Sequence, residues 1–264
     1  MTGHGVDAVV MPRPWAGYGA LTRVETLMFL REPFAVLFTI ALPVGLHLVF
    51  AAAFGRYAEL GVPLSSLGLT GITLMVASYL GLMGVPIVLA EYREMGVIRS
   101  LRVTPVRLRT FVAAHITVEV AMCALSLALC YTVTAVGFDL EFRGSVAALL
   151  VLTAALLLTF LALGFAISSL GFSARTSQAL GAAMYFVSLF TSGATIPRSQ
   201  FPSGLRAVFD RMPASILLDE LRDTWAGQQT WSGFVVAITV LAVVAGGGVI
   251  VAVRGFVATA GRAG

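Results

Sequence analysis

Six long apolar segments constrain this chain more than any other feature of its sequence. They cover residues 34–54, 67–90, 111–136, 145–170, 179–196 and 232–253. Each holds roughly 18 to 26 residues, and a helix of that length, at about 1.5 Å per residue, crosses a hydrocarbon layer of ~30 Å. Strands of a membrane barrel are about half as long and alternate in polarity, which these segments do not. The sequence therefore predicts an all-α integral membrane protein with six transmembrane helices in a single membrane domain, residues 1–264.

The composition agrees, because 58% of the residues are hydrophobic and only 11% are charged. A soluble domain carries about 25% charged residues. The first apolar segment begins at Phe34 and has no cleavage motif of the signal-peptide kind, so we expect no cleavable signal.

The arginines predict the orientation of the chain in the membrane. The sequence contains no lysine, and 11 of its 17 arginines lie before the first predicted span, in the second-to-third and fourth-to-fifth connections, and after the last span. Basic residues collect on the cytoplasmic side of a membrane protein. We therefore expect both termini to be cytoplasmic and the protein to lie in a plasma membrane.

The segment 15–32 precedes the first span and has a helical pattern. Tyr18, Leu21, Val24 and Met28 recur at helical spacing, whereas Glu25 falls on another face. This pattern predicts an interfacial elbow helix; a soluble amphipathic cap on the bundle is the alternative.

The connection between the second and third spans, EYREMGVIRSLRVTP, begins at Glu91 and is strongly charged. We expect a short cytoplasmic helix over residues 91–102, followed by a break at Thr104 and Pro105, where a threonine N-cap and a proline at the first position are typical of a new helix. The alternative is an ordinary arginine-rich loop.

The long connection before the last span predicts two amphipathic helices within residues 202–225, separated by Met212 and Pro213. We expect them to fold back against the external membrane surface, as re-entrant-like helices.

The absence of particular motifs excludes several chemistries. A Walker A loop needs a lysine to reach the nucleotide phosphates, and this chain has none. The three histidines, His4, His47 and His115, are far apart and show no metal-ligand spacing, so no metal site is expected. His47 lies deep in the first span and is a candidate for the translocation path, whereas His115 and Glu119, four residues apart, are expected at the solvated membrane interface.

These ordered segments together resemble the ABC-2 type permeases, in particular the daunorubicin- and multidrug-resistance-like exporters of bacteria. Arg31-Glu32-Pro33, leading into a span with Pro43, is similar to the family's entry from its elbow helix. EYREMGVIRSLRVTP is similar to its cytoplasmic signature. SGATIPRSQFPSGLRAVFDRMPASILLDELRDTW is similar to the segment after the fifth span, although it has Met212-Pro213 where the family more often has Asn-Pro.

The resemblance implies that residues 91–102 form a coupling helix that docks on a separate ATP-binding subunit. The docking residues would be Glu91, Arg93, Glu94, Gly96, Val97, Ile98, Leu101, Arg102 and Pro105. ATP and Mg²⁺ would be bound by that partner, so this chain would hold no cofactor and no catalytic site. Two ATPase subunits and a second permease chain, identical or homologous, would complete the transporter.

The functional hypothesis is therefore a permease subunit of an ATP-driven exporter for an apolar or amphipathic substrate, such as a drug, an antibiotic or a lipid. Phe186 and Phe190 of the fifth span, together with His47, are the candidates for the translocation path. Export of a polysaccharide or a lipid-linked glycan is the alternative within the family. A secondary transporter driven by an ion gradient is the alternative from another class, and it predicts carboxylates at mid-membrane depth.

Overall fold

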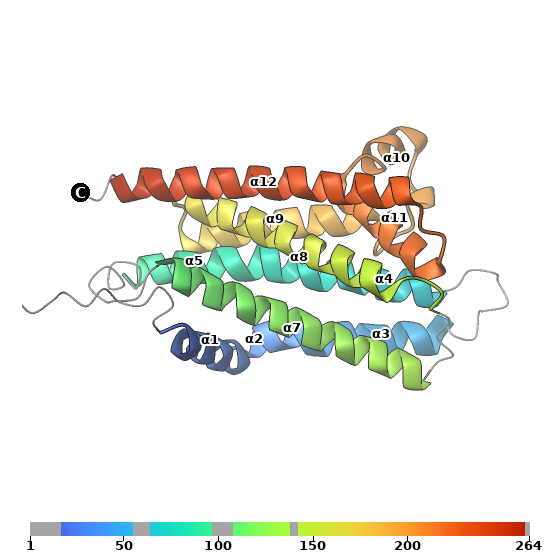
Figure 1. Ribbon diagram of the computed structural model, residues 1–264, viewed down its shortest axis with the longest axis horizontal. Coiled ribbons are helices and arrows are strands. Elements are labelled where there is room, and N and C mark those ends of the chain that lie inside the picture. The colour runs from blue at the N-terminus through green and yellow to red at the C-terminus, as the bar shows by residue number, and fades with distance from the viewer. Residues whose placement is uncertain (1–16, 55–63, 97–107, 138–141, 262–264) are drawn as a thin grey trace, which may run out of the picture.

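The computed structural model describes residues 17–54, 64–96, 108–137 and 142–261. Within these ranges the chain is helical and has no β-strand, so the predicted all-α class is confirmed. The helices lie side by side in an elongated bundle, with α10 and α11 at one end and the C-terminus at the other (Figure 1). In chain order they are α1 (Tyr18–Arg31), α2 (Pro33–Val36), η1 (Leu37–Ala41), α3 (Leu42–Phe54), α4 (Leu64–Tyr79), η3 (Leu80–Gly84), α5 (Val85–Glu94), α7 (Leu108–Gly137), α8 (Val146–Ser169), α9 (Ala174–Ser192), η4 (Arg198–Gln200), α10 (Ser203–Phe209), α11 (Pro213–Ala226) and α12 (Trp231–Gly261).

In the described part of the chain, four helices are long and apolar enough to cross a membrane: Gly68–Glu94, Thr110–Val133, Val146–Ser169 and Trp231–Gly255. A fifth candidate is a bent pair in which Tyr18–Arg31 meets Pro33–Val49 at 82°. Helix α9 falls outside this group because its first turns carry Arg175, Thr176 and Gln178, which lower its mean hydropathy. The six predicted spans are compatible with these helices, and their number stays a prediction.

The fifth predicted span is displaced along the sequence. It was expected over residues 179–196, but α9 runs from Ala174 to Ser192. The Ser173 side chain caps its start by accepting from the Thr176 N–H, and Gly193 ends it in the left-handed conformation, at φ 79°. Hydrophobicity alone missed these boundaries because capping residues are polar or small.

Two π-helical turns, η1 and η3, interrupt the first two spans, and each precedes a proline. Pro43 cannot donate a hydrogen bond to Thr39 O, and Pro86 cannot donate one to Leu82 O, because proline has no N–H. Ser126 of α7 donates to Thr39 O at 2.5 Å and so supplies a donor that the helix lacks. The π-turn thereby ties the first span to α7.

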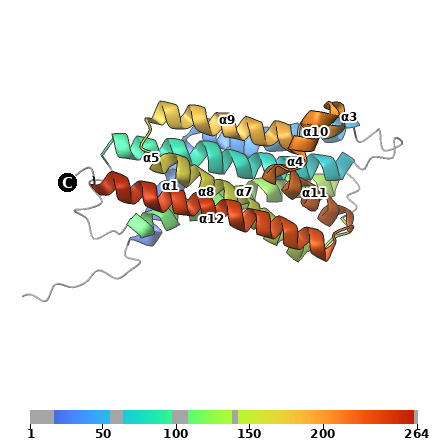
Figure 2. The same cartoon turned by 90° about the horizontal axis from the view of Figure 1, so that it is seen from above.

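Close approach of backbones sets the packing at the middle of the bundle. A Cβ at Gly81 of η3 would lie 2.5 Å from Phe160 Cβ of α8, and one at Gly181 of α9 would collide with Leu82 O. Small residues allow membrane helices to approach in this way. Helices α8 and α9 therefore pack directly on the second span, with α4 and α5 between α9 and α8 in the view from above (Figure 2).

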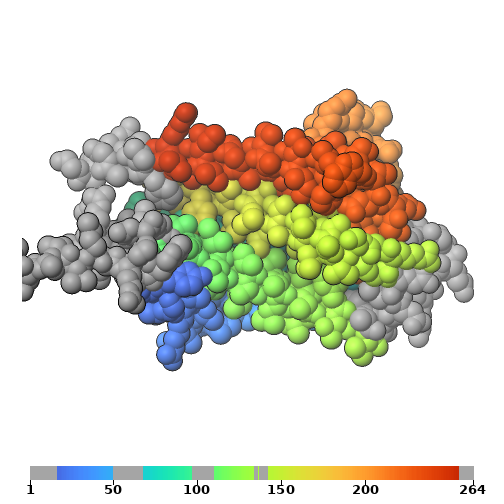
Figure 3. Space-filling model, viewed as in Figure 1, coloured from blue at the N-terminus to red at the C-terminus, as the bar shows by residue number. Residues whose placement is uncertain are grey.

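Helix α12 lies along α8 at the edge of the bundle (Figure 3). Its exposed side chains include Val236, Val243 and Val253, as expected for a surface in contact with lipid. Of the three consecutive glycines in this helix, Gly248 contacts α8 at Ala162, whereas Gly246 and Gly247 face open space. Close packing at this position therefore depends on one glycine.

Helix α1 exposes part of its apolar face and buries a glutamate. Val24 and Met28 are about half exposed, and Glu25 is the buried residue of this helix. The helix ends because Glu32 precedes a proline, which favours extended backbone. An exposed apolar face suits an interfacial location, whereas the buried glutamate needs a polar partner inside the bundle.

Candidate functional site

The charged end of the second span binds the chain's own backbone. Arg93 donates to Ser168 O at 2.8 Å and to Phe172 O, at the end of α8 and in the turn after it. Glu94 accepts a hydrogen bond from the Ala174 N–H at 2.8 Å, at the positive end of α9. Together these two side chains, which we call the α5 clamp, hold the α8–α9 turn against the end of α5.

The prediction of a separate helix over residues 91–102 is wrong in its first half. Glu91, Arg93 and Glu94 are the last turn of α5, which continues the second span. The helix ends at Glu94, and Gly96 has a left-handed φ of 74° that terminates it. The remaining predicted docking residues, Val97, Ile98, Leu101, Arg102 and Pro105, lie outside the described residues.

A cluster of four polar side chains lies at the junction of α1, α5 and α7. Its members are Glu25, Tyr92, His115 and Glu119, which are 7%, 7%, 4% and 3% exposed. Tyr92 Oη donates to Glu25 Oε1 at 3.1 Å, and His115 Nδ1 lies 3.1 Å from Glu25 Oε2. His115 Nε2 lies 3.6 Å from Glu119 Oε1. The expectation that His115 and Glu119 are solvated at the interface is wrong, because both are buried, with Glu25 of α1 against His115 and Gly84 of η3 beside the Glu119 carboxylate.

His47 is buried where α3 faces α4. A Cβ at Gly68 of α4 would lie 3.8 Å from His47 Nδ1, so the imidazole occupies the space that the glycine leaves. A role for His47 in the translocation path stays a prediction.

Phe186 and Phe190 are 52% and 46% exposed on the outer side of α9. They end a row of rings in which Phe38 stacks on Tyr79 at 5.5 Å, Tyr79 meets Tyr185 edge-on at 6.1 Å, and Tyr185 meets Phe186 at 5.3 Å. The row thus joins the first, second and fifth predicted spans. Sequence reasoning missed Phe38 and Tyr79 because no spacing along the chain relates them to α9.

The opposite end of the bundle is closed by a network centred on Arg198. This arginine pairs with Asp210 at 2.7 Å and with Asp219, and Arg222 lies 3.5 Å from Asp219. Arg222 also donates to Gly193 O at 2.7 Å. The network fastens η4 and α10 to α11 and ties α11 to the end of α9, so the predicted external helices form an ordered cap.

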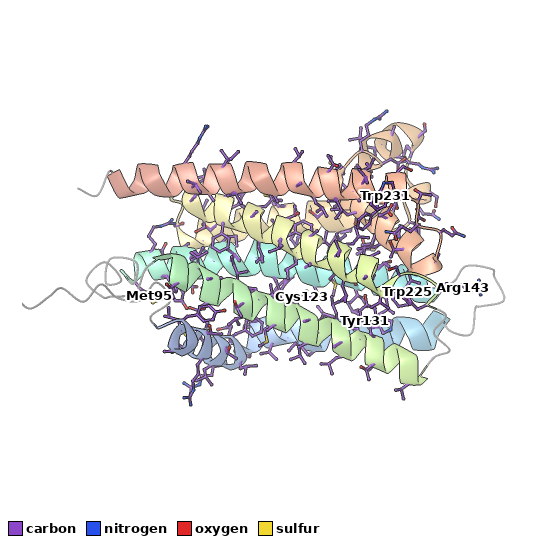
Figure 4. All side chains as sticks on the ribbon, in the orientation of Figure 1. Met95, Cys123, Tyr131, Arg143, Trp225 and Trp231 are labelled. Carbon is purple, nitrogen blue, oxygen red and sulfur yellow. The ribbon has the colours of Figure 1, made fainter. Side chains whose placement is uncertain are left out.

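Aromatic stacking anchors this cap to the spans. Tyr131 of α7 stacks on Trp225 of α11 at 5.6 Å, and Phe142 meets the same indole edge-on at 4.9 Å. Figure 4 shows Tyr131 and Trp225 near the capped end, far from Met95 at the α5 clamp. The bundle therefore has two different ends, one charged around α5 and one covered by α10 and α11.

The sequence model of the ABC-2 type transporter family matches residues 17–225, from α1 to the end of α11. The chain belongs to the ABC-2 type transporter family. No curated protein matches it in sequence. This ABC-2 permease is therefore a multi-pass membrane protein from a family of transport subunits, and membership in it implies an ATPase partner. The match covers the α5 clamp, the buried cluster and the external cap, and it leaves α12 outside.

Proposed function

We propose that this ABC-2 permease is the membrane subunit of an ATP-driven exporter, which moves an apolar or amphipathic substrate, such as a drug, an antibiotic or a lipid, out of the cytoplasm. The α5 clamp is the observation that carries the proposal. Arg93 and Glu94 tie the start of the cytoplasmic connection to α8 and α9. A force applied after Gly96 would reach the second, fourth and fifth predicted spans together, as the coupling of an external ATPase to the spans requires.

The clamp divides the predicted docking residues into two groups. Arg93 and Glu94 are engaged within the chain, so their role is to transmit movement. Val97, Ile98 and Leu101 would fill a groove on the ATPase, and Glu91 and Arg102 would make salt-sensitive contacts around it. Two such ATPase subunits would bind ATP and Mg²⁺, because the permease has no lysine for a Walker A loop.

A second permease chain, identical or homologous, would complete the path. The exposed rings of Phe186 and Phe190 would then face an apolar or amphipathic cargo rather than lipid. Resemblance to the daunorubicin- and multidrug-resistance-like exporters supports the outward direction. The arginine distribution supports cytoplasmic termini in a bacterial plasma membrane.

The test is co-purification of the tagged permease with its ATPase, followed by an ATPase assay in lipid. Replacing both Ile98 and Leu101 by Asp should abolish ATPase binding and leave the permease folded, because charged side chains cannot fill an apolar groove. Leu205→Asp on α10 is the matched control: Leu205 is half exposed, and α10 lies at the end of the bundle opposite the α5 clamp, so ATPase binding should persist.

The ATPase should respond to candidate drugs or lipids in the wild-type complex. A Walker-containing partner whose turnover rises with a drug supports the exporter, and stimulation by a lipid-linked glycan alone would favour the alternative cargo. Retained ATPase binding by the double Asp variant, or flux driven by an ion gradient without ATP, would overturn the proposal.

A further inference from the structure

The buried cluster of Glu25, Tyr92, His115 and Glu119 has two polar atoms without a hydrogen-bond partner in the described part of the chain. They are His115 Nε2 and Glu119 Oε2. Buried polar groups in native proteins are hydrogen-bonded with few exceptions, so each exception needs a physical explanation. Here Nε2 faces the Glu119 carboxylate at 3.6 Å, slightly beyond hydrogen-bond reach.

The partners of His115 determine what could fill this gap. Glu25 Oε2, an acceptor, lies 3.1 Å from Nδ1, so Nδ1 carries the hydrogen and donates it. In a neutral imidazole the lone pair is then on Nε2 and is directed at a carboxylate, where two acceptors oppose each other. One added proton resolves the conflict, either as an imidazolium N–H on His115 Nε2 or as a carboxylic O–H on Glu119 Oε1.

The charges of the cluster favour the same proton. With both carboxylates ionised and the imidazole protonated, the cluster still has a net charge of −1. Among the described residues, no ion pair joins an arginine to Glu25 or Glu119. The other titratable groups that interact with the cluster are Tyr79 on α4, Cys123 on α7 and Glu91 on α5, and Glu32 in turn interacts with Tyr79. None of these four groups is a cation. Without the proton the buried charge would be −2, which a low-dielectric interior strongly disfavours.

We propose that His115 and Glu119 share a bound proton, and that this proton strengthens the attachment of α1 to α7. Glu25 is the buried residue of α1, and its partner on α7 is His115 Nδ1. An imidazolium makes a charge-assisted hydrogen bond to Glu25, which is stronger than the bond from a neutral imidazole. Loss of the proton at high pH therefore loosens α1 from the bundle.

Helix α1 leads through Glu32 and Pro33 into the first predicted span. Its attachment therefore controls the angle at which that span leaves the membrane surface. The consequence for transport rests on the proposed function: export should fall as the pH on the side of α1 rises.

Proton binding is tested directly by infrared difference spectroscopy of the full-length permease in lipid nanodiscs, titrated from about pH 5 to 9, the range in which histidine pairs exchange protons. The wild type should show a carboxylic acid or imidazolium signal that disappears as the pH rises. E119Q and H115Q should both lack it, and E32Q, which changes an exposed carboxylate next to α1, should retain it. A signal that persists in E119Q and H115Q, or no such signal in the wild type, would overturn the proposal.

Amide hydrogen exchange of residues 18–31 tests the effect on α1. After correction for the intrinsic rates, exchange in the wild type and E32Q should become several-fold faster at high pH, whereas E119Q should show no pH dependence. Should E119Q fail to fold, Glu25→Gln is the second variant, and it should loosen α1 at every pH. Uniform exchange in the wild type at all pH values would contradict the attachment role. Neither measurement needs an ATPase or a cargo, so failure of the exporter proposal would leave both results interpretable.

Discussion

Substitution of Gly81 by alanine tests the close packing at the centre of the bundle. The added Cβ would lie 2.5 Å from Phe160 Cβ and 2.6 Å from Phe160 O. Non-bonded carbon atoms pack at about 3.5 to 4.0 Å, so η3 and α8 would have to separate by roughly 1 Å. The obstructing atoms belong to backbone and Cβ, which cannot rotate away as the end of a long side chain can.

The expected cost follows from two opposing effects. Overpacking a well-filled core costs about 1 to 3 kcal/mol, whereas replacing a helical glycine by alanine stabilises by about 0.5 to 1 kcal/mol. Gly247→Ala on α12 is the matched control, because its Cβ would meet nothing within 4 Å and only the second effect applies. The difference between the two variants therefore isolates the packing cost, about 1 to 3 kcal/mol.

The assay is thermal unfolding in detergent, followed by the loss of monodisperse protein on size-exclusion chromatography. For a chain of this length 1 kcal/mol corresponds to about 2 to 4 °C, so Gly81→Ala should unfold about 2 to 12 °C below Gly247→Ala. Equal melting temperatures for the two variants would refute the close approach of η3 and α8. A higher melting temperature for Gly81→Ala would refute it as well.

Two further predictions concern the ends of the bundle. Arg93→Ala should speed proteolysis and amide exchange in the α8–α9 turn, because the carbonyls of Ser168 and Phe172 lose their donor. Arg206→Ala, at an exposed arginine of α10, is the control, and equal protection of the turn in the two variants would contradict the clamp. Burial raises the pKa of Glu220 on α11. The folded protein therefore binds the proton of this carboxyl more tightly than the unfolded chain does, and the stability that this provides is lost as the pH rises through the raised pKa. Glu220→Gln should therefore raise the melting temperature near neutral pH and have a smaller effect at about pH 4.5, near the ordinary pKa of the group; an equal effect at both pH values would contradict this.

The sequence predicted the helical class because the apolar segments have the length of a membrane span, and that length follows directly from residue order. It also predicted two helices in the connection before the last span, separated at Met212 and Pro213, and in the structure Pro213 is the first residue of the second helix, α11. It failed at the boundaries of α9, where Ser173 and Gly193 act through cap geometry. Hydrophobicity cannot report that geometry.

The α5 clamp was only half predictable. The charges of Arg93 and Glu94 were visible in the sequence and suggested an external partner. Their actual partners are backbone groups of Ser168, Phe172 and Ala174, about 75 to 80 residues away along the chain. Backbone acceptors and donors have no sequence signature, because every residue carries them.

The sequence alone determined that this chain belongs in a membrane, that it cannot hold a Walker A site, and that His115 and Glu119 share one face of a helix. Each of these depends on residue type and on spacing within one segment. Only the tertiary structure decided that Glu25 of α1 faces His115 and that a ring row runs from Phe38 to Phe190. Those contacts join segments far apart in the chain, and their geometry is set by the crossing and close approach of whole helices, which no local pattern encodes.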